Sequence, residues 1–252
     1  MKTLIIIPTY NEVDNLRPLL SEIFARVPES DILIVDDNST DGTGKLADEI
    51  HTGNPRVNVM HRPGKLGLGT AYLTGFKYAI AHNYDAAFEM DADFSHDPRY
   101  LPDFLQAIEH ADLVIGSRYV PGGDMPGWSL VRRVISGSGN TFARFMLGIP
   151  VHDCTAGFRC YRREVLQSLD LDSIQSQGYA FQVELVYRIM KQGFKIVEIP
   201  IIFIDRRVGK SKMSHKIIIE AFTYVLRTRL GIGKKIKESS IFSATTHSTG
   251  GI

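Results

Sequence analysis

The chain has little cysteine, no long apolar run and almost no net charge. Among its 252 residues, Cys154 and Cys160 are too few for a disulfide framework and lack His or Cys neighbours at zinc spacing, so a reducing compartment fits. Lys and Arg number 29 against 28 Asp and Glu, a net charge of +1. Because no excess positive charge is available for a polyanion, we expect no nucleic acid partner and only local basic sites.

Long apolar runs are also absent from the sequence. Nowhere do about 18 apolar residues follow one another, so the sequence predicts no membrane-spanning helix. The first apolar run, at residues 4–7, stops at Pro8 and is too short for the core of a signal peptide. We therefore expect a protein that is soluble or lies on a membrane surface.

Short apolar runs alternate with helix-like stretches, a pattern typical of repeated βα units. The predicted strands are residues 4–7, 32–35, 57–60, 86–90 and 113–115. The predicted helices are residues 12–26, 41–50, 69–82, 98–109, 129–147, 179–192 and 214–230. Because the strand runs are continuous rather than alternating, we expect both faces of the sheet to be buried.

These elements predict an α/β fold in a single domain, with a mostly parallel central sheet and helices on both faces. We assign this domain to residues 1–232. The segment after Ser239 is rich in Ser, Thr and Gly, and we expect residues 233–252 to form a disordered tail.

Acidic motifs follow three of the predicted strands. They are Pro8-Thr9-Tyr10-Asn11-Glu12, Asp36-Asp37-Asn38-Ser39 and Asp91-Ala92-Asp93. In open α/β sheets the ligand lies outside the carboxyl ends of the strands. The sequence therefore predicts a ligand site at this edge, lined by carboxylates from three strands.

Asp91 and Asp93 have the chemistry of a divalent cation site. An extended backbone places the two carboxylates of an Asp-x-Asp motif on the same side. One or two carboxylates, together with substrate phosphates, are what Mg²⁺ or Mn²⁺ takes in proteins. A lone Asp-x-Asp also arises by chance and can cap a turn, so its neighbours must decide between these roles.

The first strand lacks the glycines of a dinucleotide-binding turn, and the loop at residues 64–70 lacks the spacing of a phosphate-binding P-loop. Tyr10 could stack on a base, and Glu12 and Asp37 could accept hydrogen bonds from base or ribose. The alternative roles are the edge of the core for Tyr10 and surface caps for the two acids.

Positive charge is concentrated in three later segments. These carry Arg118, the pair Arg132-Arg133, and Arg206 with Lys212. A guanidinium fork suits phosphate oxygens, so these side chains are candidates for phosphate contacts. For any one of them, an ordinary solvated basic loop remains the alternative.

Taken together, the motifs resemble those of family 2 glycosyltransferases with the GT-A fold, and more closely the dolichol-phosphate (polyprenol-phosphate) mannose synthases. The motifs are Pro8-Thr9-Tyr10-Asn11-Glu12, Val35-Asp36-Asp37-x-Ser39-x-Asp41-Gly42-Thr43, Gly67-Leu68-Gly69-Thr70-Ala71-Tyr72, Met90-Asp91-Ala92-Asp93-x-Ser95-His96, Gly116-x-Arg118-Tyr119 and Arg206-x-x-Gly209-x-Ser211-Lys212. They occur in the family's order and cover nearly the whole chain to about Lys212.

The resemblance implies a role for each matching position. The guanosine part of GDP-mannose would lie against Pro8, Tyr10, Glu12, Val35 and Asp37. The ribose, the sugar and a Mg²⁺ or Mn²⁺ ion would lie against Asp91, Ala92 and Asp93, with Asp93 the principal metal ligand and Ser95 a further candidate. The phosphates of the donor would contact Arg118, Arg206 and Lys212, and the phosphate of the acceptor would contact Arg118, Arg132 and Arg133. The implied catalytic residues are Asp93, Arg118 and Arg132.

The implied reaction transfers mannose from GDP-mannose to a polyprenyl or dolichyl phosphate, with inversion at the anomeric carbon. The second pKa of a phosphomonoester is about 6, so this nucleophile is ionised at neutral pH and requires no general base. Three alternatives remain: a polyprenyl-phosphate hexosyltransferase using another donor such as UDP-glucose, a haloacid-dehalogenase-like phosphatase built on Asp91-x-Asp93-x-Ser95, and a non-catalytic nucleotide-sugar binder.

Many relatives end in transmembrane helices, which this sequence does not contain. Residues 216–227 are apolar with basic flanks, so 213–232 is a candidate interfacial helix, with packing on the domain as the alternative. Trp128 and the apolar residues Phe142, Phe145, Met146 and Leu147 could accept a prenyl chain or belong to the core. We expect a cytoplasmic protein, peripheral on the cytoplasmic face of a membrane, where a separate membrane subunit is a further candidate partner.

Overall fold

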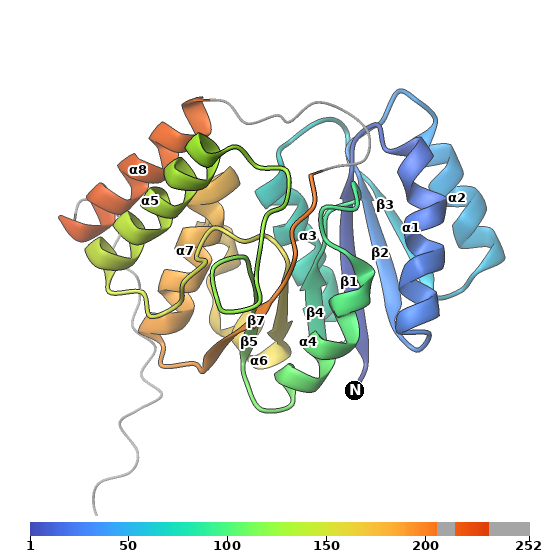
Figure 1. Ribbon diagram of the computed structural model, residues 1–252. Helices are drawn as coiled ribbons and strands as arrows, with labels where there is room; N and C mark the ends of the chain where they lie inside the picture. The colour runs from blue at the N-terminus through green and yellow to red at the C-terminus, as the bar shows by residue number, and fades with distance from the viewer. Residues whose placement is uncertain (206–214, 232–252) are drawn as a thin grey trace, which may run out of the picture.

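The computed structural model describes residues 1–205 and 215–231 (Figure 1). The predictions for Arg206, Lys212 and the tail at 233–252 lie outside the described residues. Seven strands form one sheet in the order β3-β2-β1-β4-β6-β5-β7. The strands are β1 Thr3–Thr9, β2 Asp31–Asp36, β3 Val57–His61, β4 Ala86–Glu89, β5 Leu113–Ser117, β6 Arg159–Arg162 and β7 Ile196–Pro200.

The sheet is mostly parallel, as the sequence predicts, with one exception. Strand β6 pairs antiparallel with both β4 and β5, while the other pairs of neighbouring strands are parallel. The five predicted strands are confirmed as β1 to β5, whereas β6 and β7 are additional. The sequence of β6, Arg-Cys-Tyr-Arg, contains no apolar run, and β7 is a half-buried edge strand interrupted by Glu198 and closed by Pro200.

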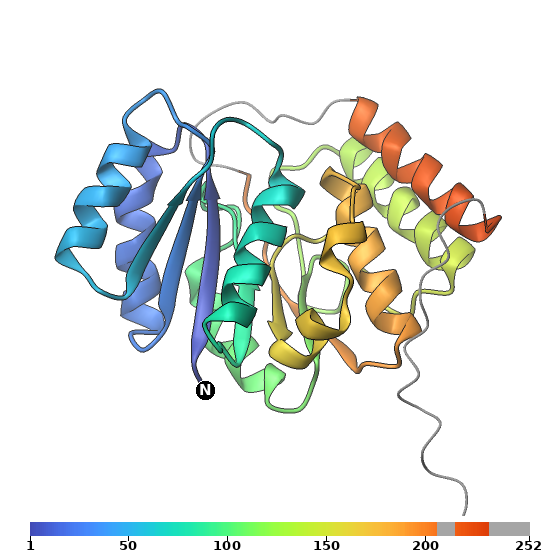
Figure 2. The ribbon, with the colours of Figure 1, turned by 180° about the vertical axis from the view of Figure 1, so that it is seen from behind.

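Helices cover both faces of the sheet, which confirms the predicted layers (Figures 1 and 2). One face packs on helices α1 Val13–Arg26, α2 Thr43–Gly53 and α4 Leu101–Ile108, and the other on α3 Leu68–Ala81, α6 Arg163–Ser168 and α7 Gly178–Lys191. Along β1, Leu4 and Ile6 point to one face while Ile5 and Ile7 point to the other, and all four are fully buried. Apolar side chains on both sides of the strand explain its continuous apolar sequence.

The remaining helices complete the fold. Short 3-10 helices, η1 Pro98–Tyr100 and η2 Leu171–Ser173, precede α4 and α7, and Asp97 caps η1 by accepting a hydrogen bond from the Arg99 backbone. Helix α3 lies so close to β1 that a Cβ added at Gly75 would approach Ile6 Cγ2 to 2.5 Å. Glycine at this position therefore lets α3 sit directly on the strand.

Helices α5 Leu130–Leu147 and α8 His215–Arg229 lie side by side at one end of the molecule (Figures 1 and 2). The rings of Phe142 and Phe222 stack with their centroids 4.5 Å apart, and Val225 belongs to the same buried cluster as α7. The predicted helix at 214–230 is thus confirmed and packs on the domain. Across residues 1–205 and 215–231, no helix combines the length and hydropathy that crossing a membrane requires.

Candidate active site

The loops after β1 and β2 are tied together at the carboxyl edge of the sheet. Asn11 and Asn38 have φ values of 60° and 57°, in the left-handed region that Asn tolerates better than most residues. The Asn11 side chain accepts a hydrogen bond from the Thr40 backbone at 2.9 Å, and Ser39 Oγ accepts one from the Asn11 backbone at 2.9 Å. These bonds hold the two predicted nucleotide-binding loops against each other.

The predicted nucleoside contacts lie along this pair of strands. Pro8 of β1 is opposite Val35 of β2 in the parallel register. Tyr10 follows β1, and the Nζ atom of Lys65 lies 4.2 Å from the centroid of its ring. Glu12 stands at the start of α1, where its carboxylate accepts a hydrogen bond from the side chain of Asn15 at 2.8 Å. The structure thus places these residues at one edge, as expected.

Asp37 is held by an arginine that the sequence analysis missed. Arg62 Nε donates to Asp37 Oδ1 at 2.5 Å, and the Leu66 backbone donates to Asp37 Oδ2 at 3.2 Å. The two terminal nitrogens of the same guanidinium donate to Thr70 Oγ1 at 2.8 Å and to the Gly67 carbonyl at 3.1 Å. Arg62 therefore joins the ends of β2 and β3 to the start of α3. Because Arg62 directly follows β3, its place at the carboxyl edge of the sheet could have been predicted from the sequence.

The loop after β4 carries Asp91, Ala92 and Asp93, and local hydrogen bonds fix its shape. Tyr72 of α3 donates its hydroxyl to Asp91 Oδ1 at 2.7 Å, and the Asp91 backbone donates to His96 Nδ1 at 2.9 Å. The Ser95 backbone donates to Asp93 Oδ1 at 3.0 Å. Both carboxylates are therefore oriented by groups of the chain itself.

Two features hold this loop in a tight conformation. Phe94 has a φ of 64°, a left-handed conformation that a bulky residue keeps only when its surroundings enforce it. His96 is buried, and its ring stacks on Phe158 with centroids 5.0 Å apart. Burial lowers the pKa of His96, and accepting a backbone N–H at Nδ1 requires its neutral form with the proton on Nε2. His96 thus supports the loop as an uncharged acceptor.

A buried acid lies under the same loop. Glu89, the last residue of β4, is fully buried and accepts hydrogen bonds from Tyr161 Oη at 2.9 Å and from Gln182 Nε2 at 2.8 Å. Burial raises the pKa of Glu89 to about 7, although the nearby Arg159 and these two hydrogen bonds oppose the shift. The carboxyl group therefore titrates near neutral pH. No pattern in the sequence indicated that Glu89 is a buried acid with a raised pKa.

Asp91 and Asp93 provide the donors that a hard divalent cation prefers. Among residues 1–205 and 215–231, no group of three or more His, Cys, Asp and Glu side chains is arranged to hold a metal. A protein site of two carboxylates fits Mg²⁺ or Mn²⁺ when substrate phosphates and water complete the coordination. Ser95 is buried, and its backbone N–H donates to the Asp93 carboxylate. The role of its hydroxyl as a metal ligand stays a prediction.

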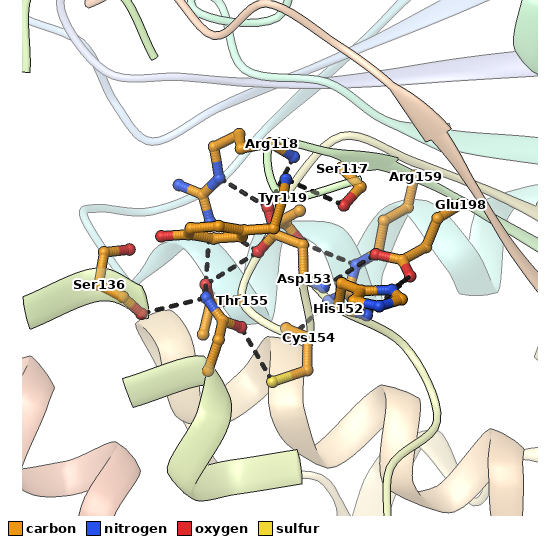
Figure 3. A network of polar contacts seen from close by, with 12 residues as sticks. Ser117, Arg118, Tyr119, Ser136, His152, Asp153, Cys154, Thr155, Arg159 and Glu198 are labelled. Atoms are coloured by element: carbon orange, nitrogen blue, oxygen red, sulfur yellow. Dashed lines mark hydrogen bonds and ion pairs between the residues drawn. The ribbon is translucent and has the colours of Figure 1, made fainter. Parts of the chain in front are cut away.

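Arg118, at the end of β5, belongs to a buried ion pair (Figure 3). Its Nε and Nη2 atoms each donate to Asp153 at 2.7 Å, and Nη2 also donates to Thr155 Oγ1 at 2.9 Å. Burial alone would raise the pKa of Asp153, but the Arg118 guanidinium holds it below its ordinary value. The pair is therefore fully ionised at neutral pH. The predicted phosphate contact of Arg118 stays a prediction.

The two adjacent arginines of α5 have different surroundings. Arg133 donates to Asp124 at 2.8 Å and to the Met125 carbonyl at 2.5 Å, so it fastens the loop that precedes α5. Arg132 donates to Asp205 at 2.6 Å and lies 3.7 Å from the centroid of the Trp128 ring. The indole Nε1 of Trp128 also donates to Asp205, at 3.1 Å. We call Trp128, Arg132 and Asp205 the Trp128 cluster.

Phe203 joins the Trp128 cluster to the loop after β4. Its ring makes edge-on contacts with Trp128, with centroids 5.7 Å apart, and with His96, with centroids 6.2 Å apart. The Arg118 guanidinium lies 5.5 Å from the centroid of the same ring. The rings of Trp128, Phe203 and His96 thus connect Arg132 to the loop after β4, and Arg118 lies against the same rings, although these residues lie far apart along the chain.

Sequence comparison now identifies the family. The family model described as Glycosyl transferase family 2 matches residues 4–170, which include β1 to β6 and the Asp91–Asp93 loop. The chain belongs to glycosyl transferase family 2. The mixed sheet is therefore that of a GT-A fold, as the resemblance implied.

Named relatives of this family 2 chain cover most of its length. An undecaprenyl-phosphate mannosyltransferase of Micrococcus luteus is 50% identical over 227 residues, which are 90% of this chain and 93% of the relative. A polyprenol monophosphomannose synthase of Mycolicibacterium smegmatis is 51% identical over 222 residues, or 87% of this chain and 84% of the relative.

A solved structure supports the fold. A mannosyltransferase from Pyrobaculum calidifontis, in complex with GDP-Man and Mn²⁺, has a TM-score of 0.56 and 14% sequence identity, and the similarity covers 92% of this chain and 73% of that one. Membership of family 2 also rejects the haloacid-dehalogenase-like alternative for the Asp-x-Asp motif.

Proposed function

We propose that the chain transfers mannose from GDP-mannose to a polyprenyl phosphate and so forms polyprenyl-phosphate mannose. The observation that carries the proposal is the identity of about half of all positions, over 90% and 87% of this chain, with two enzymes named for that chemistry. The relatives are named as mannosyl enzymes, which favours mannose over glucose as the donor sugar. The site residues are consistent with this reaction.

The donor side of the proposed site uses the loops after β1, β2 and β4. The nucleoside lies against the paired ends of β1 and β2, where Tyr10 offers a ring and Asp37 a carboxylate. Asp37 is held by Arg62, so its position is set before the nucleotide arrives. Asp91 and Asp93 then lie at the carboxyl end of β4, next to β1 in the sheet, where the ribose, sugar and diphosphate follow the base.

A divalent cation, Mg²⁺ or Mn²⁺, completes the proposed donor site, with Asp93 as its principal protein ligand and Asp91 beside it. When bound, the cation supplies positive charge against the departing diphosphate. The protein's part is to orient the two carboxylates through Tyr72 and the Ser95 backbone. A Mn²⁺ ion accompanies GDP-Man in the Pyrobaculum calidifontis mannosyltransferase, which supports a cation here.

The acceptor side is the Trp128 cluster. A phosphomonoester with a second pKa of about 6 is already ionised at neutral pH and attacks the anomeric carbon without a general base. Arg132 provides the positive charge that binds this phosphate, and Arg118 lies close by in its ion pair with Asp153. We propose a single displacement, with inversion at the anomeric carbon and GDP as the leaving group.

The proposed location is the cytoplasmic face of a membrane, because a prenyl phosphate acceptor is a lipid. Helix α5 has no acidic residue and carries three arginines, Arg132, Arg133 and Arg144. Its exposed apolar side chains are Leu130, Val131, Val134, Ile135 and Phe145. An exposed apolar stripe with basic residues beside it is the pattern of a helix that binds an anionic lipid surface. Helix α8 lies alongside and exposes Ile219 and Phe222.

The test is direct identification of the product. The protein is incubated with Mg²⁺ or Mn²⁺, a short polyprenyl phosphate and, one at a time, GDP-mannose, GDP-glucose, UDP-glucose and UDP-GlcNAc, and the lipid product is weighed by mass spectrometry. We expect a hexosyl product from GDP-mannose. Product from UDP-glucose alone would replace the proposed donor, and binding of GDP-mannose without any lipid product would favour a non-catalytic binder.

The matched variants are Asp93→Asn and Asp103→Asn. We expect Asp93→Asn to abolish transfer while its thermal unfolding remains cooperative, because the residue belongs to the proposed cation site. Asp103 is an exposed carboxylate in the first turn of α4 and should tolerate the same change. Transfer by Asp93→Asn at the wild-type rate would contradict the assignment of this residue.

A further inference from the structure

The Trp128 cluster contains a carboxylate that the proposed reaction has not used. Asp205 accepts two hydrogen bonds, one on each oxygen: Trp128 Nε1 donates to Oδ1 at 3.1 Å, and Arg132 Nη1 donates to Oδ2 at 2.6 Å. The indole ring in turn lies 3.7 Å from the Arg132 guanidinium carbon. Arg132 is therefore held on its face by Trp128 and at one nitrogen by Asp205.

The geometry of this contact suits a carboxylate. The indole N–H and the guanidinium N–H are both donors and approach different oxygens of Asp205, so keeping both contacts in place needs an acceptor atom at each position. Asp does so, whereas Asn offers one acceptor oxygen and would turn an NH₂ group toward the other donor. The neutral isostere thus cannot keep both contacts.

Among the residues that the structure describes, this arrangement occupies only one nitrogen of the guanidinium. Within the part of the chain that the structure describes, Arg132 donates through Nη1 to Asp205 and through no other side-chain atom. Arg133, by contrast, donates hydrogen bonds from both terminal nitrogens to the loop that precedes α5, at Asp124 and the Met125 carbonyl. The side chain of Arg132 is 29% exposed, so part of it is open to solvent.

We propose that Asp205 is a positioning residue for the acceptor: with Trp128, it orients Arg132 before the polyprenyl phosphate binds. The proposal rests on the proposed function, because it takes Arg132 as the contact for the acceptor phosphate. Fixing a long arginine side chain in advance removes an ordering cost that the ligand would otherwise bear. In this role Asp205 acts through Arg132 rather than on a substrate.

A carboxylate near a phosphate could instead compete with it for Arg132. The two roles give opposite results when the negative charge is removed. If Asp205 positions Arg132, the Asp205→Asn variant binds the acceptor more weakly. If Asp205 competes, the same variant binds the acceptor more tightly. The geometry favours positioning. Asp205 occupies a single nitrogen of the Arg132 guanidinium, and the Trp128 ring beneath the guanidinium fixes its plane.

The chain offers a clean probe of this site, because Trp128 is its only tryptophan. Its fluorescence therefore reports on the Trp128 cluster alone. A short-chain polyprenyl phosphate is titrated into wild type, Asp205→Asn and Asp205→Glu, and the dissociation constant is read from Trp128 emission. The KM values for acceptor and for GDP-mannose are measured in parallel.

For Asp205→Asn we expect the dissociation constant and the KM of the acceptor to rise about two- to tenfold, the range set by ordering one long side chain, while the KM of GDP-mannose changes less than twofold. Asp205→Glu keeps two acceptor atoms and should recover part of the loss. Trp128 emission of the free protein should shift in Asp205→Asn, because the indole N–H loses its charged partner. An unchanged or lower dissociation constant for the acceptor would overturn the proposal.

The matched control is Asp85→Asn. Asp85 pairs with Arg163 beyond the amino end of β4, and the side-chain exposures of that pair, 24% for Arg163 and 48% for Asp85, are close to the 29% and 50% of Arg132 and Asp205. The control should leave acceptor binding and Trp128 emission unchanged. An equal loss in both variants would mean that the effect of Asp205→Asn is a general loss of stability, which contradicts positioning.

The outcomes separate this proposal from the proposed function. If wild type forms no mannosyl lipid but binds prenyl phosphate in a manner that depends on Asp205, the proposed reaction fails and the positioning role stands. If wild type forms the product and Asp205→Asn has the wild-type acceptor KM, the positioning role fails and the reaction stands.

Discussion

The buried ion pair between Arg118 and Asp153 predicts a large loss of stability when one partner is neutralised. Asp153 accepts three hydrogen bonds from Arg118, from Nε and Nη2 at 2.7 Å and from the backbone at 3.1 Å, and both side chains are almost completely buried. Asp153→Asn keeps the shape but leaves the guanidinium without its counter-charge. Breaking a buried pair from one side costs about 3–5 kcal/mol, and we expect a loss of this size at pH 7.

The pH dependence of this loss has a definite sign. The Arg118 guanidinium outweighs the effect of burial and holds the pKa of Asp153 below its ordinary value of 3.8. A carboxyl group whose pKa is lowered by folding contributes stability that is complete above its unfolded pKa and is lost as the pH falls through its folded pKa. The difference between wild type and Asp153→Asn should therefore be constant from about pH 5 to 7 and shrink below about pH 4.

Urea unfolding followed by circular dichroism at several pH values measures both effects. The control is Asp172→Asn, which breaks the exposed ion pair with Lys77 and should cost less than about 1 kcal/mol. The double variant Arg118→Met/Asp153→Leu removes both charges and should recover most of the stability. A loss of under about 1 kcal/mol in Asp153→Asn at pH 7, equal to the control, would refute the reasoning.

Three further predictions concern the loop after β4 and helix α5. Tyr72→Phe removes the hydroxyl that donates to Asp91, so we expect Mn²⁺ to bind about two- to tenfold more weakly in calorimetric titrations with GDP present; unchanged affinity would contradict the orienting role of Tyr72. Folding raises the pKa of Glu89 from 4.5 to about 7, so between these pH values the folded protein holds a proton that the unfolded chain has lost. The free energy of unfolding of wild type should therefore fall by up to on the order of 3 kcal/mol as the pH rises from 4.5 to about 7. Glu89→Gln should lack this loss in metal-free thermal unfolding, and an identical pH profile would reject the assignment. Replacing Val131 and Val134, which are 69% and 57% exposed, with Gln should weaken flotation with anionic vesicles without lowering the melting temperature; undiminished flotation would contradict α5 as the membrane contact.

The sequence predicted the strands whose stability comes from their own apolar side chains. Strands β1, β2, β4 and β5 bury apolar runs between two helical layers, and such runs are visible without a structure, whereas in β3, at the sheet edge, only Val57 is buried. Strand β6 was not predicted because its burial depends on distant partners. Arg159 is fully buried there and donates to the carbonyls of Cys154, Ala156 and Gln182. An arginine with such partners looks like a surface residue in the sequence alone.

At the candidate site too, residues next to strand ends could be predicted from the sequence, whereas contacts between distant segments could not. The acids after β1, β2 and β4 could be placed together because parallel strands end at one edge of a sheet. Arg62 follows β3 and falls under the same rule, so it was accessible to sequence reasoning. The contacts of Tyr72 with Asp91 and of Asp205 with Arg132 could not be predicted from the sequence. They join residues 19 and 73 positions apart and depend on how α3 and α5 pack.

The pair Arg132-Arg133 illustrates why side-chain partners, rather than residue types, assign the roles at this site. From the sequence both arginines are candidates for the acceptor phosphate, and the resemblance names only Arg132 as catalytic as well. Because adjacent residues of a helix point about 100° apart, Arg133 reaches back to Asp124 and the Met125 carbonyl, while Arg132 lies over Trp128. A guanidinium with both ends bound fixes a loop, whereas one held by a ring face and a single nitrogen keeps donors for a ligand. In the proposed reaction Arg132 is therefore the better placed of the two for the acceptor phosphate, while Arg133 fastens the loop that leads to Trp128.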